Sequence, residues 1–371
     1  MCAFSTFATP FSSISYQFLG ATPDYWCHVS ELMEANWTQE QIITFAIPLS
    51  NLTGKREGCL MHNYNYTSAA QLGFNKVMSN IPSVSNIDDT LLACSSRVYN
   101  TSQYESSIVT EWDLTCDRRA LYSTTSSVMQ AGTLLGSLLY GHLLEAIGRR
   151  KTVLFSSVSS ILTSALIIAS HNVEVFIFLR MLNQIFDIGY YMGPVILCME
   201  VCSPSQRTYA GALYLIPWAL GYMMVPAVAY YIRPWRWLQA AFTVPILYTL
   251  IYFWVLPESP RWLILHGRYQ ETLNLLKKAA SVNHRTLPPD HVLLATMKHI
   301  RSKETSEKCE RRESVGVSVR TRLEQLLRET FVLVLTPGLR LKAFVVFYLW
   351  ITSSAIYYGI SLNSYNLRCD V

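Results

Sequence analysis

The sequence predicts an all-α, multi-pass membrane protein. Hydrophobic residues make up 51% of its 371 residues and charged residues only 15%, whereas soluble domains carry roughly 25% charged residues. The apolar residues gather into runs of roughly the 20 residues that a helix needs to cross a bilayer. The period-two alternation of a membrane β-barrel is absent. Each run is therefore expected to be a helix, because a helix satisfies its own backbone in lipid.

The apolar runs divide the chain into consecutive segments. Residues 1–19 lack the basic start of a signal peptide, so we interpret them as part of a first transmembrane helix. The remaining segments are, in order, a polar loop (20–120), transmembrane helices 2–6 (121–256), a basic loop with short helices (257–338), transmembrane helix 7 (339–361) and a truncated tail (362–371).

The loop 20–120 has the features of an extracellular segment. It holds every Asn-X-Ser/Thr glycosylation sequon of the chain, at Asn36, Asn51, Asn65 and Asn100. It also holds Cys27, Cys59, Cys94 and Cys116. Outside the cell these cysteines are expected to form disulfides, and the sequence leaves all three connectivities open.

The loop 257–338 is expected to be cytoplasmic. It contains more Lys and Arg than Asp and Glu, and short loops on the same side carry Arg149, Arg150 and Arg207. Basic residues in short loops favour the cytoplasmic side. Arg233 and Arg236, between the fifth and sixth helices, are exceptions to this rule.

Three charged motifs lie at the cytoplasmic helix ends. The first runs from Gly141 to Lys151 and contains Glu145, Gly148, Arg149 and Arg150. It resembles the loop between helices two and three of major facilitator transporters, although the family's Asp and Arg are here Glu145 and Ala146. The resemblance implies that these residues hold the cytoplasmic side shut in one state.

The other two motifs resemble charge motifs of sugar porters and organic ion transporters. One places Arg207 seven residues after Glu200, and the other is Pro257-Glu258-Ser259-Pro260-Arg261-Trp262. Opposite charges that pair in one conformation and separate in the other can bias alternating access. We therefore expect Glu200, Arg207, Glu258 and Arg261 to take part in conformational gating.

Four further stretches identify a narrower family. They are Phe18–Cys27, Ile108–Cys116, Trp235–Gln239 and Tyr357–Gly359. They resemble the organic cation, organic anion and carnitine transporters, the solute carrier 22 family of the major facilitator superfamily. The resemblance implies the N-terminal six-helix half plus helix 7 of a twelve-helix fold, truncated after the seventh helix. It also implies a plasma-membrane location.

The same resemblance suggests which side chains touch substrate. Aromatic residues at matching positions are Tyr191, Trp218, Trp350, Tyr357 and Tyr358. Their faces attract organic cations and also stack on planar anions; the alternative is ordinary packing or an interfacial belt. Asp187, two helical turns from Arg180, is either a counter-charge for a cationic substrate or a partner for Arg180 through water.

The sequence therefore predicts a transporter of small organic ions (cations, carnitine-like zwitterions or anions) that works by alternating access. The alternative is a truncated, non-transporting form that at most associates with a full-length transporter. No enzyme motif is present, so we expect no catalytic residues, cofactor or metal site. The expected partners are the small organic ion, the lipid bilayer and possible copies of the chain in a homo-oligomer, without nucleic acid.

Overall fold

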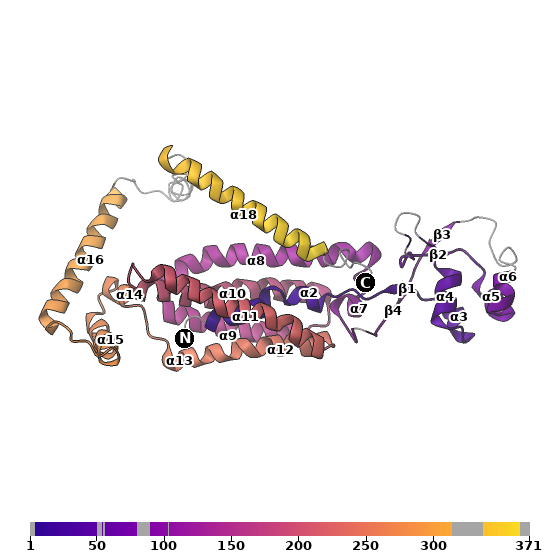
Figure 1. Cartoon of the computed structure of the whole chain (residues 1–371), viewed down its shortest axis with the longest axis horizontal. Coiled ribbons are helices and arrows are strands. Elements are labelled where there is room, and N and C mark those ends of the chain that lie inside the picture. Colours follow the sequence, from indigo (N-terminus) through magenta and orange to yellow (C-terminus); the bar gives the residue numbers. More distant parts are fainter. Residues whose placement is uncertain are drawn as a thin grey trace.

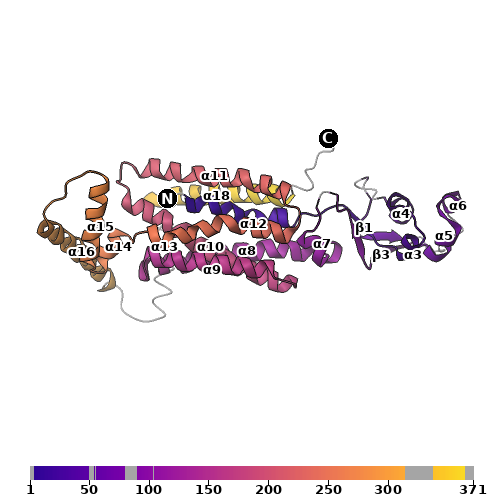
Figure 2. The same ribbon diagram turned by 90° about the horizontal axis from the view of Figure 1, so that it is seen from below.

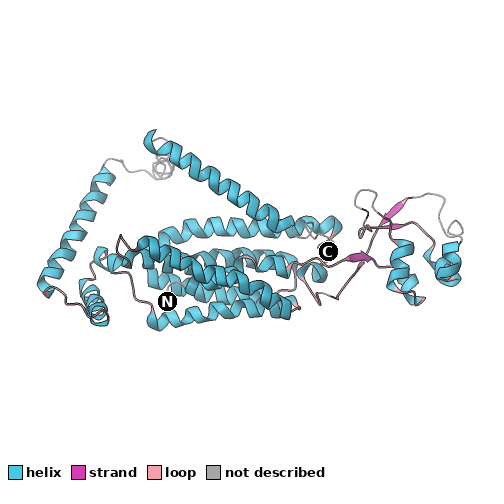
Figure 3. Ribbon diagram, viewed as in Figure 1, coloured by secondary structure: helices cyan, strands magenta, loops and turns pink. Residues whose placement is uncertain are grey.

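The computed structural model describes residues 4–49, 54, 56–79, 90–102, 104–313 and 337–363. Long helices lie side by side in an elongated bundle (Figure 1), and the strands are confined to one end of it (Figure 3). Further helices continue from the opposite end (Figure 2). Long apolar helices therefore form the body of the molecule, and the polar segments extend from its two ends.

The bundle is built from the apolar runs of the sequence. Its elements are α1 (Phe4–Ser13), α2 (Ser15–Leu19), α8 (Arg119–Ala146), α9 (Arg149–Ile168), α10 (Val173–Val201), α11 (Arg207–Tyr231), α12 (Trp235–Leu247), η3 (Tyr248–Ile251), α13 (Tyr252–Val255) and α18 (Pro337–Asn363). Within the described residues, four helical segments are long and apolar enough to cross a membrane: Arg149–Ile168, Arg207–Tyr231, Trp235–Val255 and Gly338–Tyr357. α8, with 28 residues, and α10, with 29, are longer than these four segments and are not among them.

α10 lies at the centre of the bundle, packed against α8, α9 and α1. Glycines on α8 make its contact with α10 close, because a Cβ at Gly132 would lie 2.7 Å from the carbonyl oxygen of Met181. Small residues allow this kind of backbone approach between membrane helices. α1 packs mainly on α11, and Ile14 separates it from α2.

α18 stands apart from the other long helices. It runs obliquely to α8 in Figure 1. None of the residues in its candidate span is buried, so its apolar faces are open to lipid or to another helix.

One end of the bundle carries a disulfide-bonded cap, which we define as residues 25–118. Its elements are β1 (Tyr25–Cys27), α3 (Ser30–Glu34), α4 (Gln39–Ala46), β2 (Leu60–His62), α5 (Tyr66–Leu72), α6 (Phe74–Ser79), β3 (Leu91–Ala93), β4 (Arg97–Tyr99), α7 (Ile108–Trp112) and η2 (Cys116–Arg118). β1 pairs antiparallel with β4, and β2 with β3. Disulfides join Cys27 to Cys94 and Cys59 to Cys116. A small apolar core that includes Leu32 and Phe45 fills the cap.

The opposite end of the bundle, which we call the latch end, contains Gly148 and Glu258. Here α14 (Pro260–Leu265), α15 (Tyr269–Val282) and α16 (Asp290–Glu313) follow α13. α14 packs on both α15 and α16. Ser259 caps α14 by accepting from the backbone N–H of Trp262 at 3.3 Å, and Pro260 occupies its first turn.

Candidate functional site

Arg149 joins three helices at the latch end. Its guanidinium donates to the Glu200 carboxylate on α10 at 2.7 Å and to the backbone carbonyl of Leu144 on α8 at 3.2 Å. The side chains of Arg149 and Glu200 are only 11% and 13% exposed. Salt therefore screens this ion pair less than an exposed one. The contact fastens the start of α9 to the end of α10.

The Glu258 carboxylate caps the start of α9. Its Oε1 accepts from the backbone N–H of Arg149 at 2.8 Å and from that of Arg150 at 3.2 Å. The first N–H groups of a helix have no partner within the helix and favour a negative charge. Gly148 makes this approach possible, because it has a φ of +107° and a Cβ there would lie 2.6 Å from Glu258 Oε2.

Two further contacts draw the latch end together. The Trp262 indole donates to the backbone carbonyl of Glu145 at 2.7 Å and so joins α14 to α8. The Arg150 guanidinium donates to the carbonyl of Phe253 on α13 at 2.8 Å. Charged and polar contacts thus bind three segments to one another: the end of α8, the start of α9 and the segment α13–α14.

The side chains of the other expected gating residues lie outside this network. The Glu145 side chain is exposed, and only its carbonyl takes part. Glu200 pairs with Arg149 rather than with Arg207, which is exposed at the first residue of α11 and is in none of the ion pairs of the described residues. Arg261 pairs with Glu304 on α16 at 2.8 Å, where its side chain is 62% exposed.

Three aromatic residues meet between α11 and α18. Trp218 lies against Tyr222 with ring centroids 4.4 Å apart, and the Tyr222 and Tyr357 hydroxyls are 3.0 Å apart. Trp350 is 70% exposed on α18, and Tyr191 is half-buried on α10. The structure thus brings two of the expected substrate residues, Trp218 and Tyr357, together through Tyr222. The Tyr358 side chain lies outside the described part of the structure.

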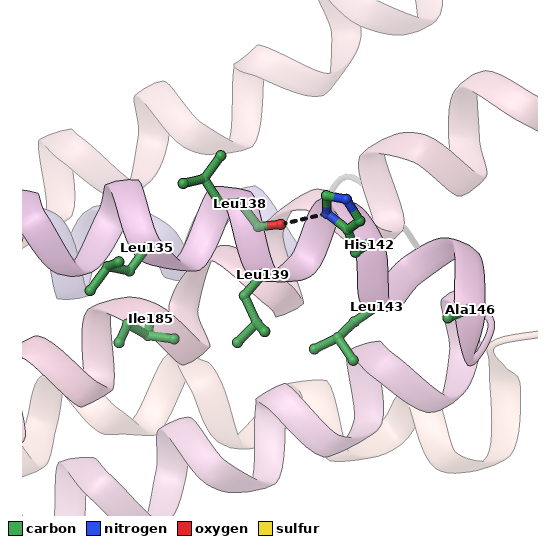
Figure 4. Close-up of a pocket in the computed structure, with 7 residues that line it drawn as sticks. All are labelled: Leu135, Leu138, Leu139, His142, Leu143, Ala146 and Ile185. Atoms are coloured by element: carbon green, nitrogen blue, oxygen red, sulfur yellow. Dashed lines mark hydrogen bonds between the residues drawn. The ribbon is translucent and has the colours of Figure 1, made fainter. Parts of the chain in front are cut away.

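An apolar groove lies elsewhere, on α8 and α10. It has a volume of about 580 Å³ and is lined by Leu135, Leu138, Leu139, His142, Leu143, Ala146 and Ile185 (Figure 4). Its polar side chain, His142, has Nδ1 3.0 Å from the Leu138 carbonyl oxygen. None of the expected substrate residues lines this groove.

Asp187 is buried in a polar cluster formed by α1, α9 and α10. It is 3% exposed, and its carboxylate accepts from the Ser12 hydroxyl of α1 and from the Ser160 hydroxyl of α9, the latter at 2.5 Å. Arg180, 1% exposed, donates instead to the Ser15 hydroxyl at 3.1 Å. The two charges therefore share a cluster without a direct ion pair.

The disulfide-bonded cap is fastened to the bundle through Glu111. Its carboxylate accepts from the Trp235 indole at 2.6 Å and from the Arg236 guanidinium at 2.5 Å. Arg236 also donates to the carbonyls of Ile168 and Ser170 at the end of α9. Arg236, one of the two exceptions to the charge rule, is thus bound by an acid and two carbonyl groups.

A second charged contact lies within the cap. Asp113 accepts from both Arg97 and Tyr99. Burial, followed by the hydrogen bond to Asp113, raises the pKa of the Tyr99 phenol well above its usual range. Tyr99 therefore remains a hydrogen-bond donor at physiological pH.

Three of the four sequons lie within the described part of the cap. Asn36 and Asn65 are exposed and Asn100 is half-buried, whereas Asn51 lies outside the described residues. The Asn65 side chain also accepts from the backbone N–H of Ser68 at 3.1 Å and caps α5.

Several polar contacts could not be read from the sequence. Asp187 has two hydrogen-bond partners, Ser12 and Ser160. Both lie on other helices, and neither belongs to a sequence motif. The contact of Tyr222 with Trp218 had one signal in the sequence, because Tyr222 follows Trp218 by one helical turn and so lies on the same helix face. In the part of the chain that the structure describes, no group of three His, Cys, Asp or Glu side chains could hold a metal ion.

Comparisons with known proteins found a matching family and several similar proteins. Residues 65–347 match the family described as "Sugar (and other) transporter". The "Organic cation transporter protein" of Drosophila melanogaster is 31% identical over 358 residues, which are 96% of this chain and 60% of that protein. "Solute carrier family 22 member 13" of Homo sapiens is 29% identical over 382 residues, 98% of this chain and 60% of that protein. The chain thus spans about 60% of the length of these relatives.

A solved structure of the xylose transporter XylE from E. coli, in a partially occluded inward open conformation, is also similar. It aligns with a TM-score of 0.46 and 15% sequence identity, covering 81% of this chain and 58% of that one.

Proposed function

Because this chain belongs to the organic cation and organic anion transporters, the solute carrier 22 family of the major facilitator superfamily, we propose that it transports small organic ions by alternating access. Membership also places it among multi-pass membrane transporters rather than enzymes. The proposed location is the plasma membrane, with the disulfide-bonded cap outside and the latch end inside.

The observation that carries this proposal is the Arg149–Glu200 ion pair at the latch end. It joins α9 to α10 at 2.7 Å, and Glu258 joins α9 to α13–α14 at the same place. Contacts of this kind can hold a bundle shut in one state and separate in the other, which biases the equilibrium between the two. We assign the gating role to Arg149, Glu200 and Glu258 and a supporting role to Trp262.

The substrate class is proposed from the aromatic residues between α11 and α18. Trp218, Tyr222 and Tyr357 present ring faces and hydroxyl groups near one another. Ring faces attract quaternary ammonium groups and other organic cations, with an energy of about 0.5–2 kcal/mol for each contact. Organic cations and carnitine-like zwitterions are therefore the first substrates to test, and planar aromatic anions the second.

An uptake assay tests the proposal. Cells that express the chain would be given radiolabelled tetraethylammonium, carnitine or benzoate, with surface biotinylation to confirm that the chain reaches the plasma membrane. The same assay would be run after fusing to Val371 the C-terminal part of a relative that this chain does not cover. Uptake in either form, reduced by Glu200→Ala, supports transport; surface expression without uptake in both forms refutes it.

A second candidate function is association with a full-length transporter or with another copy of the chain. The exposed faces of α18, whose candidate span contains no buried residue, favour it. Co-purification of the chain with a full-length relative, lost when α18 is replaced by an unrelated transmembrane helix, would support this function.

A further inference from the structure

Asp187 is a buried acid without a cationic partner in direct contact. It is 3% exposed, and none of the ion pairs among the described residues includes it. An acid at this depth in a membrane helix is costly, and such acids are typical of proton relays and ion pathways. A purely structural role would be expected to pair it directly with Arg180.

Arg180 is held away from Asp187 by other contacts. Its guanidinium donates to the Ser15 hydroxyl at 3.1 Å and lies 5.9 Å from the ring centroid of Tyr16 and 5.6 Å from that of Phe176. The hydroxyl and the two ring faces together stabilise the buried cation. The carboxylate of Asp187 is therefore hydrogen-bonded to hydroxyl groups and not to the Arg180 guanidinium.

These hydroxyl partners come from two different helices. Ser12, on α1, donates to one carboxylate oxygen, and Ser160, on α9, donates to the other at 2.5 Å. The amide of Asn183 donates to the Ser160 hydroxyl oxygen at 3.3 Å, which directs the Ser160 proton towards Asp187. Asp187 thus forms a bridge between α1 and α9 from its own position on α10.

We propose that Asp187 is a proton-binding site that controls how tightly α1 packs against α9 and α10. A proton from a hydronium ion binds to a carboxylate oxygen, water is released, and the carboxylate becomes a neutral acid. Hydrogen bonds to an ionised acceptor are roughly twice as strong as those between neutral groups. Protonation therefore weakens the Ser12 contact and loosens α1, while proton release tightens it.

Arg180 is the cation among the charged and titratable groups that interact with Asp187, so a proton on Asp187 changes the net charge of the cluster. Arg180 and Tyr190 on α10 and Tyr140 on α8 interact with it electrostatically. From α1 and α9 its hydrogen-bond partners are the neutral hydroxyls of Ser12 and Ser160. A proton on Asp187 thus changes the charge of the cluster from balanced to positive, because Arg180 keeps its own charge.

The effect on transport, a dependence of uptake on pH, rests on the proposed function; proton binding itself does not. The test therefore measures the proton directly. Infrared difference spectra of the purified chain in lipid vesicles, recorded between about pH 5 and 8, report the carbonyl stretch of a protonated carboxyl group. We expect a band that titrates in the wild type and is absent in Asp187→Asn.

Ser160→Ala provides the matched variant, because it keeps the carboxyl group and removes one donor to its ionised form. We expect the midpoint of the band to move to higher pH by about one to two units. Identical spectra of the wild type and Asp187→Asn across the whole range would overturn the proposal, as would a midpoint unchanged in Ser160→Ala. If the band titrates as expected but the chain shows no uptake, the proposed function fails and the proton site stands.

Discussion

The Glu258 carboxylate lies 2.8 Å from the backbone N–H of Arg149, although 109 residues separate the two positions in the chain. The same carboxylate accepts from Arg150, so it serves as a cap for α9 supplied by a distant segment. Any movement that separates α13 and α14 from α9 must break these bonds and leave the first N–H groups of α9 without a partner. The start of α9 is therefore coupled to the segment that leads out of the bundle.

Replacing Glu258 with Ala is expected to destabilise the chain by about 1–2 kcal/mol, because two part-buried backbone donors lose their acceptor and the start of α9 loses a favourable charge. Thermal unfolding of the purified chain in lipid vesicles would measure this. Glu145→Ala is the control, since the Glu145 side chain is exposed at the same end of the bundle. Equal unfolding temperatures for the two variants would contradict the capping role.

The Arg149–Glu200 ion pair is expected to be energetically coupled. A double-mutant cycle with Arg149→Ala and Glu200→Ala should give an interaction energy of about 1–3 kcal/mol, because both side chains are nearly buried. The Arg261–Glu304 pair is the matched control: its arginine is 62% exposed, and its coupling should be below about 1 kcal/mol. Similar couplings for the two pairs would rule out a special role for Arg149.

The membrane helices could be predicted because their signal is local. A run of apolar residues must be helical in lipid, so the pattern in α9, α11 and α18 is enough. The short elements of the disulfide-bonded cap could not be predicted in the same way. β1 and β4 are each three residues long, and they form a strand pair although they lie far apart in the sequence.

The charged motifs of the candidate site could be recognised in the sequence, but the residues that they contact in the fold could not. Resemblance placed Glu200 and Arg207 in one charge motif, whereas folding brings Arg149 to Glu200 from the preceding helix. Glu258 belonged to a charged motif, yet its role as a cap depends on Gly148, whose φ of +107° opens space for the carboxylate. Spacing along a chain predicts which residues share a helix face, and only the packing of helices decides what that face meets.

The close approach of α8 and α10 gives a sharp test of packing. Gly132→Leu should destabilise the chain by about 1–3 kcal/mol or more, because a Cβ at Gly132 would already lie 2.7 Å from the Met181 carbonyl oxygen. Gly141→Leu on the same helix is the control, since a Cβ there would meet no atom within 4 Å beyond its chain neighbours and the nearby backbone of its own helix. Thermal unfolding would compare the two. A larger loss for Gly141→Leu would mean that α8 packs differently.

Removing the charge of Glu111 should loosen the disulfide-bonded cap from the bundle. Glu111→Gln replaces a charge-assisted hydrogen bond to Arg236 with a weaker neutral one, at an expected cost of about 1–2 kcal/mol. Limited proteolysis would detect faster cleavage between the cap and the bundle. Glu105→Gln, an exposed acid of the same cap, should leave the cleavage rate unchanged. Equal rates in both variants would show that Glu111 does not anchor the cap.

Glycosylation tests the proposed orientation of the bundle. The sequons at Asn36 and Asn65 lie exposed on the cap, whereas the latch end lies at the opposite end of the bundle. If the cap is outside, Asn36→Gln should remove one glycan, seen as a shift on an electrophoresis gel that glycosidase treatment abolishes. An Arg285→Thr change creates a new sequon at Asn283, which is exposed after α15. In the proposed orientation this site would face the cytoplasm and should stay unmodified. A glycan on Asn283 would place both ends of the bundle on the same side and exclude a membrane-spanning arrangement of the helices between them.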